Sequence, residues 1–494
     1  MFNKINPNWN KSVISITILL SLVLSIFVII NPIYSSKILS SIYTNLSNYF
    51  ESFYMYGTFG LLLFLFFIGI SKYGSFRVVL KNKPTYSMLS WSSMLFAGGI
   101  GATLLYWSTV EWIDYYNILK NDSLVDNKEL FLYSRAYPLF HWGFSAWAIY
   151  CLPAVAFGIA LTLRPETNLT FSGILGAKNN LIKFILDIIF IGAIICGAGV
   201  GLGLSFPLIS SVISDIFQIE RTAILDIFVI LLCLSIFGTS AYVGVQNGIR
   251  RLSNINISLV IIFLSVVFLL GPTKYILLNS VETIGFLFSN YVEMSLTTGT
   301  EISINWSVFY WAWWLAMAPM IGTFIINVSN NKTLRQIIFG TILIGSIGCF
   351  FSMLILSNLS ISFFESGYIN GPNIIGNKIV SREELVVQTI SALDYSYILL
   401  LVFSVILIIF LCTTYDSTTY VLASASMKRS SMNSSKSLRV LFAVLLVIQP
   451  TLLMYLNGVD AFKWIMVIFS TPLLFIYLML IFSILKNVYT IKIT

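Results

Sequence analysis

The sequence predicts an all-α integral membrane protein with twelve transmembrane helices. Of its 494 residues, 57% are hydrophobic and only 10% are charged, and the mean hydropathy is +0.90. A soluble chain carries roughly 25% charged residues. Apolar runs of about 20 residues, the length that crosses the hydrocarbon core of a bilayer, recur along the whole chain. The lipid bilayer is therefore the expected surroundings of most of this protein.

The individual spans are read from apolar runs that end at charged and turn residues. The first run follows Lys4 and Lys11 like a signal peptide, but it is long and has no small-x-small cleavage site, so we expect an uncleaved span. The predicted spans are residues 13–33, 53–71, 88–111, 138–163, 183–212, 223–245, 254–271, 304–328, 335–361, 394–425, 438–457 and 462–485.

Basic residues favour one side of this arrangement. With the N-terminus inside, 19 of the 28 Lys and Arg fall on the inner side, as the positive-inside rule requires. Both termini are therefore expected in the cytoplasm, with the protein in the plasma membrane. The net charge of +8 is explained by topology, and no nucleic-acid partner is expected.

Several kinds of chemistry are disfavoured by the composition. All five cysteines lie inside apolar runs and His141 is the sole histidine, so neither disulfides nor a zinc or haem site is expected. There is no nucleophile–base pair, and no resident cofactor is expected. An integral-membrane enzyme and a channel stay as alternative classes. Recovery of unmodified substrate would exclude an enzyme, and saturable uptake would exclude a channel.

Three spans contain unusual residues. In the third span, Gly98, Gly99 and Gly101 indicate either an unwound helix that lines a cavity or close helix packing. Residues 196–207 of the fifth span are also rich in glycine, and there we expect packing. In the tenth span, Asp416 lies among hydroxyls, three of which are candidate cation ligands. These are Thr413, Thr414 and Thr418. The alternative for Asp416 is a helix cap near the membrane face.

Six of the eleven tryptophans lie in two helices, within 142–147 and 306–314. On a helical wheel, one face carries four residues, namely Tyr310, Trp313, Trp314 and Met317, while Trp311 points elsewhere. Trp147 and Tyr150 share a face of the other helix. Several indole faces around one space suit a quaternary ammonium, which is held by ring quadrupoles. The alternative is aromatic core packing.

Four motifs together resemble the betaine/choline/carnitine transporter family. They are FAGGIGATLLYWSTVEW, HWGFSAWAIY, GIRRLSNINI and WAWWLAMAP with NKTLRQ downstream, and they cover about residues 85–440. The resemblance implies two inverted five-helix repeats of the leucine-transporter type, spans 3–7 (85–272) and spans 8–12 (304–485), and a homotrimer. Residues 1–84 would form the N-terminal segment and spans 1 and 2. Residues 273–303 are expected to form an interfacial helix or an ordered loop, and 486–494 a short cytoplasmic C-terminus.

The resemblance also implies a substrate site. Its aromatic box would consist of Trp142, Trp147, Tyr150, Trp313 and Trp314, with Tyr310 and Met317 beside them and backbone amides near Gly99 and Gly101 for a carboxylate. Met317 stands where glycine-betaine symporters carry a further Trp. Asp114 stands where the carnitine exchanger has a Tyr, and we expect it to be an outer-loop charge rather than a contact of the cationic head group.

Sodium coupling follows from the same resemblance. The ion would be held by carbonyls of Ala97, Ile100 and Phe410 and by hydroxyls of Thr413 and Thr414. Uncharged Asn256 replaces the fixed Arg of the sodium-independent exchanger, and GIGAT replaces the usual GMGIG of a second sodium site. The expected function is sodium-driven import of a trimethylammonium zwitterion such as glycine betaine. The alternatives are carnitine/γ-butyrobetaine exchange and uptake of choline or a sulfonium compound.

Overall fold

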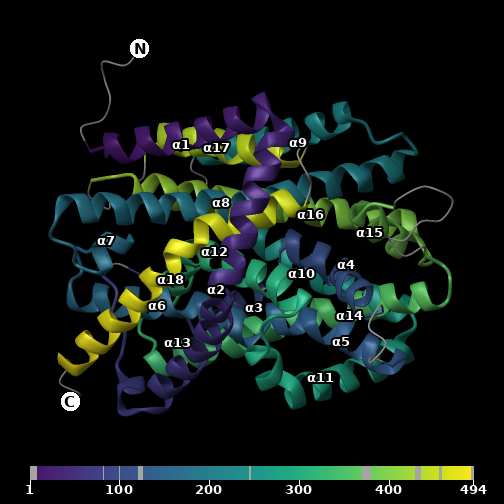
Figure 1. Ribbon diagram of the computed structural model, residues 1–494, viewed down its shortest axis with the longest axis horizontal. Coiled ribbons are helices and arrows are strands. Elements are labelled where there is room, and N and C mark those ends of the chain that lie inside the picture. The colour runs from purple at the N-terminus through teal and green to yellow at the C-terminus, as the bar shows by residue number, and fades with distance from the viewer. Residues whose placement is uncertain are drawn as a thin grey trace.

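All named secondary-structure elements are helices in the part of the chain that the computed structural model describes (Figure 1). The described residues are 8–81, 83–98, 101–120, 126–243, 246–369, 380–428, 435–454 and 459–490. Within them, nine helices are long and apolar enough to cross a membrane, or ten if one bent pair counts as a span. An all-α membrane protein is thus confirmed. The count of twelve spans and the two inverted repeats stay predictions.

Every predicted span overlaps a helix. The helices that correspond to spans 1–7 are α1 (Lys11–Ile30), α2 (Pro32–Ile70), α3 (Met88–Gly98) with α4 (Ala102–Leu119), α5 (Asn127–Trp142) with α6 (Phe144–Leu163), α8 (Asn180–Phe217), α9 (Ala223–Val243) and α10 (Gln246–Leu270). Those of spans 8–12 are α12 (Val308–Val328), α13 (Leu334–Phe339) with α14 (Gly345–Glu365), α16 (Ser396–Ala425), α17 (Lys436–Met454) and α18 (Val459–Thr490). Short helices α7 (Phe171–Ile174) and α15 (Arg382–Ser391) lie in connections, and α11 (Thr273–Leu296) occupies the predicted interfacial segment.

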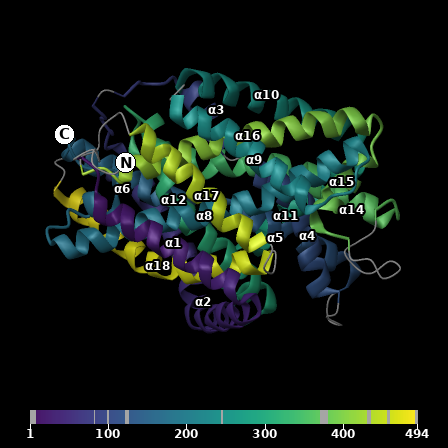
Figure 2. The same ribbon diagram turned by 90° about the horizontal axis from the view of Figure 1, so that it is seen from above.

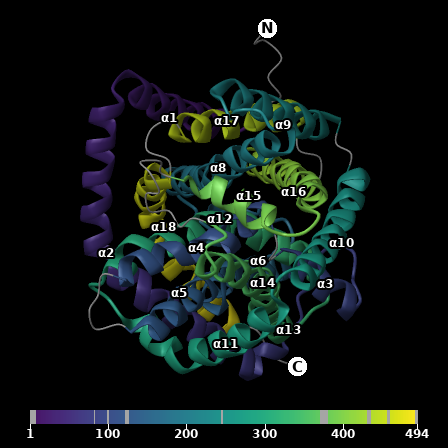
Figure 3. The ribbon, with the colours of Figure 1, turned by 90° about the vertical axis from the view of Figure 1, so that its right-hand side faces the viewer.

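The helices form a packed centre with others around it. Viewed end-on, α4, α6, α8, α12 and α14 lie in the middle (Figure 3), and α12 packs along α6, α8 and α18. Figures 2 and 3 place α2 and α10 on opposite sides of the molecule. The side chains of α12 are almost all buried. Its tryptophans therefore face other helices rather than lipid.

The third span is broken, as its glycines predicted. Helices α3 and α4 meet at an angle of 55°, with Gly98 at the end of one and Gly101 before the start of the other. Gly99 and Ile100 lie outside the described residues. The first backbone N–H groups of a helix have no partner within the helix, and at the start of α4 no side chain caps them either.

Two helices begin earlier in the sequence than the spans that were predicted for them. Helix α2 begins at Pro32 rather than at 53, and α5 begins at Asn127 rather than at 138. Both early segments contain charged residues, which interrupted the apolar runs. The structure buries some of these charges with partners: Glu51 of α2 accepts a hydrogen bond from the backbone N–H of Gly299 (2.7 Å).

The glycines of α8 allow close helix packing, as expected. A Cβ on Gly203 would lie 1.9 Å from the ring of Phe462 in α18, and one on Gly201 would lie 2.6 Å from the hydroxyl of Tyr415 in α16. No side chain fits at either position without displacing a neighbour. These glycines therefore set the distance from α8 to α16 and α18.

Replacing Gly203 by alanine is expected to lower the melting temperature of the purified protein. The added methyl group collides with Phe462, and overpacking of this kind costs about 1–3 kcal/mol. Gly192→Ala in the same helix is the matched control, because no atom lies within 4 Å of its Cβ position and alanine favours helix by about 1 kcal/mol. A Gly203→Ala protein as stable as Gly192→Ala would contradict this packing.

Candidate functional site

A cavity of about 160 Å³ lies at the break in the third span. It is lined by helices far apart in the sequence, including α4, α6, α8, α12 and α16. Its lining consists of Gly98, Gly101, Ala102, Thr103, Leu104, Trp142, Trp147, Tyr150, Ser205, Trp313, Trp314, Met317, Met320, Ile321, Phe410, Leu411, Thr414 and Tyr415. The structure therefore brings the two aromatic helices and the glycine-broken span to one space.

Trp314 is the centre of the aromatic wall. Its ring centroid lies 4.5 Å from that of Tyr150, 5.3 Å from that of Trp142 and 6.4 Å from that of Trp147. None of these pairs is stacked face to face: the ring planes of Trp142 and Trp314 cross at 81° and the other two pairs are tilted. The four rings thus surround part of the cavity instead of closing on each other.

Trp313 and Met317 complete the wall on the side of α8. The indole Nε1 of Trp313 donates a hydrogen bond to the carbonyl of Gly197 (3.0 Å). A Cβ on Gly197 would lie 2.9 Å from the sulfur of Met317. The backbone carbonyl of Gly197 therefore binds Trp313, and the lack of a side chain at Gly197 leaves room for Met317.

Tyr310 does not line this cavity, although its position on the helical wheel predicted that it would. It is fully buried and its ring stacks on that of His141, with centroids 4.6 Å apart and planes 16° from parallel. Trp311 packs against Phe140 at 5.4 Å, in agreement with the packing role expected for it. Tyr310 supports the wall from behind.

A buried carboxylate beside the aromatic wall was missed from the sequence. Glu111 of α4 is completely buried. It accepts hydrogen bonds from Trp142 Nε1 (2.9 Å) and the Tyr115 hydroxyl (2.6 Å), and His141 Nδ1 lies 3.2 Å away. The other ring nitrogen of His141 lies 2.8 Å from the hydroxyl of Ser307. The sequence did contain a signal for this site: Glu111 is an acid within a predicted span, and His141, the sole histidine, directly precedes Trp142.

Replacing Glu111 by alanine is expected to lower the melting temperature more than replacing it by glutamine. Alanine leaves the buried N–H of Trp142 and hydroxyl of Tyr115 without their acceptor, at about 1–3 kcal/mol for each unsatisfied group. Glutamine keeps one carbonyl oxygen for the indole. Thermal unfolding of the two purified variants compares them directly. Equal melting temperatures would show that these hydrogen bonds do not hold Trp142.

The predicted sodium ligands are only partly brought together. Phe410 and Thr414 line the cavity. The hydroxyl of Thr413 donates to carbonyls of its own helix, at Ile409 (2.9 Å) and Phe410 (3.2 Å). Ala97 lies in α3, half-buried and outside the cavity lining. Two of the predicted ligands therefore line the same cavity as the ends of the broken span, while predicted ligand Ile100 and predicted amide donor Gly99 lie outside the described residues.

Three further polar residues have defined places. Asn256 is fully buried in α10 and donates to the carbonyl of Ile406 in α16 (3.2 Å). Asp416 is 7% exposed inside α16, so it caps neither end of that helix. Asp114 belongs to α4 and pairs with Arg382 at 2.5 Å, which corrects the expectation of a loop charge.

Comparisons with known proteins agree on one group of transporters. A protein-family model described as "BCCT, betaine/carnitine/choline family transporter" matches residues 12–492. A carnitine transporter of Acinetobacter baumannii is 28% identical over 86% of this chain and 79% of its own. The glycine betaine transporter OpuD of Bacillus subtilis is 28% identical over 87% and 84%. The osmo-independent choline transporter BetT1 of Acinetobacter baylyi is 27% identical over 82% and 79%.

Proposed function

The chain belongs to the betaine/carnitine/choline transporter family, and from this premise we propose that it imports a trimethylammonium zwitterion, with glycine betaine as the first candidate, by sodium-coupled alternating access. The observation that carries the proposal is the wall of four aromatic rings around one cavity, centred on Trp314. Membership alone does not choose among betaine, carnitine and choline, so the substrate is argued from the chemistry of the site.

The aromatic wall suits a cation that has no N–H to donate. A trimethylammonium group makes no hydrogen bonds, and each desolvated contact with an indole face contributes about 2 kcal/mol. Among the described residues, the cavity lining contains no acidic or basic side chain, so these residues offer no ion pair to an ammonium. This selects for methylated nitrogen over a primary amine, which would lose its hydrogen bonds to water.

The start of α4 offers a place for the carboxylate of the substrate. Gly101, Ala102, Thr103 and Leu104 line the cavity, and the backbone N–H groups there have no side-chain cap. Free amides and the helix dipole make a helix N-terminus a site for anions. A zwitterion fits this arrangement better than choline, which has a hydroxyl and no negative charge.

Sodium coupling is supported by the position of Thr414 and Phe410 and by Asn256. Hard cations prefer oxygen ligands, and both residues line the cavity beside the broken span, where the hydroxyl of Thr414 would be one such ligand. Asn256 is neutral and is held by the carbonyl of Ile406, one helical turn before Phe410. No fixed positive charge therefore stands at the position where the sodium-independent exchanger carries arginine.

The orientation of the chain in the membrane is assigned from the distribution of basic residues. We assign the face that carries α15 to the outside of the plasma membrane and the face that carries α7 to the cytoplasm, with α15 at the right of Figure 1 and α7 at the left. Helix α18 then runs inward, because Lys463 near its start lies 3.4 Å from the ring centroid of Trp306 at the α15 face.

A second candidate is sodium-independent exchange of carnitine-like compounds. It is favoured by Met317, which lines the cavity where an additional Trp would narrow it, and which leaves room for a longer zwitterion. The similar carnitine transporter of Acinetobacter baumannii makes carnitine a natural test compound. Sodium dependence separates this candidate from the first.

Competition for uptake into proteoliposomes tests the proposed substrate class. Labelled glycine betaine, carnitine and choline are each offered to the purified chain, with unlabelled glycine betaine or glycine as competitors. We expect saturable uptake of unmodified glycine betaine that its unlabelled form inhibits and glycine does not. Equal inhibition by glycine would contradict recognition of the methylated nitrogen.

A further inference from the structure

The fourth predicted span is interrupted beside the aromatic wall. Helix α5 ends at Trp142 and α6 begins at Phe144, with Gly143 between them. Trp142 thus lies on one side of the interruption, whereas Trp147 and Tyr150 lie on the other. The geometry of this junction therefore decides how three rings of the wall face one another.

Gly143 leaves the start of α6 without a cap from its own segment. A Cβ at this position would lie 2.5 Å from the carbonyl oxygen of Leu139 and 3.0 Å from the ring of Phe350, so a larger residue does not fit without displacing a neighbour. Glycine has no side chain that could accept a hydrogen bond from the first N–H groups of α6. Because these groups have no partner within the helix, an acceptor has to come from elsewhere.

The acceptor comes from α11. The hydroxyl of Tyr291 accepts a hydrogen bond from the backbone N–H of Ser145 (3.0 Å) and lies 2.7 Å from the hydroxyl of Ser145. Ser145 is 1% exposed and Tyr291 is 9% exposed, so water has little access to this contact. Without the hydroxyl of Tyr291, a buried N–H would lose its acceptor, which is unfavourable.

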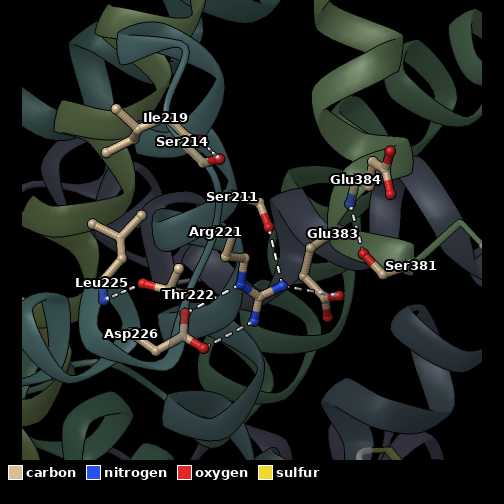
Figure 4. Close-up of polar contacts among 10 residues, drawn as sticks. All are labelled: Ser211, Ser214, Ile219, Arg221, Thr222, Leu225, Asp226, Ser381, Glu383 and Glu384. Carbon is tan, nitrogen blue, oxygen red and sulfur yellow. Dashed lines mark hydrogen bonds and ion pairs between the residues drawn. The ribbon is translucent and has the colours of Figure 1, made fainter.

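Two helix starts elsewhere in the described chain are capped from within their own segments (Figure 4). At the start of α15 the hydroxyl of Ser381 accepts from the N–H of Glu384 (3.1 Å), and at the start of α9 the hydroxyl of Thr222 accepts from the N–H of Leu225 (3.4 Å). Such caps act on the helix that carries them. The cap of α6 instead connects it to a residue 146 positions away.

The ring of Tyr291 also contacts both sides of the junction. Its centroid lies 5.4 Å from that of Phe140 in α5 and 5.8 Å from that of Phe144 in α6. On the side of α5, Glu111 of α4 already binds the indole of Trp142. Tyr291 therefore supplies for the start of α6 what Glu111 supplies for the end of α5.

We propose that Tyr291 is a positioning residue for the aromatic wall: its hydroxyl fixes the start of α6, and so the direction in which α6 presents Trp147 and Tyr150 beside Trp142. Tyr291 is not among the described residues that line the cavity, so it acts through α6 and not on the substrate. The effect on substrate affinity rests on the proposed function, whereas the cap itself does not.

Hydrogen exchange of the purified chain tests the cap without any substrate. Tyr291→Phe removes the hydroxyl and keeps the ring beside Phe140 and Phe144. We expect the amide of Ser145 to exchange about fivefold faster in this variant, the factor that corresponds to one ordinary hydrogen bond. Mass spectrometry of the peptide that contains Ser145 measures the rate. Equal exchange in the parent and in Tyr291→Phe would refute the cap.

Uptake kinetics test the consequence for the wall. We expect Tyr291→Phe to raise the KM for glycine betaine about fivefold at an unchanged maximal rate, because misdirected rings weaken binding of the cation while the amount of folded carrier stays the same. Thr222→Ala is the matched control, since it removes a cap from α9, which contributes no residue to the described cavity lining. A merely structural role would lower the maximal rate and leave KM unchanged, and that result would overturn the positioning role. An equal rise of KM in Thr222→Ala would overturn it as well.

A double variant shows whether Tyr291 acts through α6. Tyr150→Leu removes the ring of α6 whose centroid lies 4.5 Å from that of Trp314. With this ring gone, Tyr291→Phe should raise KM by a smaller factor than it does in the parent, as for two residues that share one effect. Equal factors in both backgrounds would refute action through α6. Failure to find uptake of glycine betaine would count against the proposed function, and the exchange rate of Ser145 would still decide on the cap.

Discussion

Replacing Trp314 by leucine is expected to raise the KM for glycine betaine uptake about 30-fold. The indole lies at the centre of the wall, next to Tyr150, Trp142 and Trp147, and a desolvated cation–π contact contributes about 2 kcal/mol. Leucine keeps the site apolar but has no ring quadrupole. Saturation of labelled uptake into proteoliposomes measures the change.

Phenylalanine at the same position separates the two roles of the indole. Trp314→Phe keeps an aromatic face with a weaker quadrupole, so its KM should lie between those of the parent and Trp314→Leu. If leucine and phenylalanine raised KM equally, the ring would be serving as packing volume. The alternative of aromatic core packing would then be preferred for this helix.

Removing the hydroxyls of Thr413 and Thr414 together is expected to abolish stimulation of uptake by sodium. Valine has nearly the same shape and lacks the oxygen that a hard cation requires. Ser417→Ala is the matched control on the same helix, because Ser417 is exposed and its hydroxyl donates only to the carbonyl of Thr413 in the described structure. The measurement is the initial uptake rate as a function of sodium concentration.

The sodium proposal is rejected if Thr413→Val/Thr414→Val retains the sodium response of the parent. If the parent itself shows no sodium response but exchanges internal for external substrate, the second candidate function replaces the first. Both outcomes leave the aromatic site untouched, so the two proposals are judged separately.

The aromatic site was largely predictable because its signal is local. Indoles are rare, and spacing at i, i+3, i+4 and i+7 placed Tyr310, Trp313, Trp314 and Met317 on one face of a helix; the structure brings the last three of these to one cavity. The glycines of the third span likewise predicted a break in the helix, and the structure has one between α3 and α4.

Tyr310 shows where helical-wheel reasoning fails. The wheel gives the direction in which each side chain leaves α12 (Val308–Val328), but not how far along that face the cavity extends. What Tyr310 meets is decided by His141, a residue that is far away in the sequence. A single helix contains no information about such a partner.

The polar clusters depend even more on distant residues. Arg382 and Asp114 are 268 positions apart, and each alone looks like an ordinary charge near a span end. Glu111 was visible as an acid within an apolar run, but its role as acceptor for Trp142 required the packing of α4 against α5. Tertiary contacts of this kind cannot be derived from composition or periodicity.

Uptake of labelled glycine betaine into proteoliposomes, with and without an inward sodium gradient, measures recognition of the substrate and its coupling to sodium in one experiment. We expect saturable accumulation above the external concentration only with the gradient, and its loss in Trp314→Leu at substrate concentrations near the KM of the parent. Uptake that depends neither on the sodium gradient nor on the indole of Trp314 would contradict both the proposed substrate site and the proposed sodium coupling.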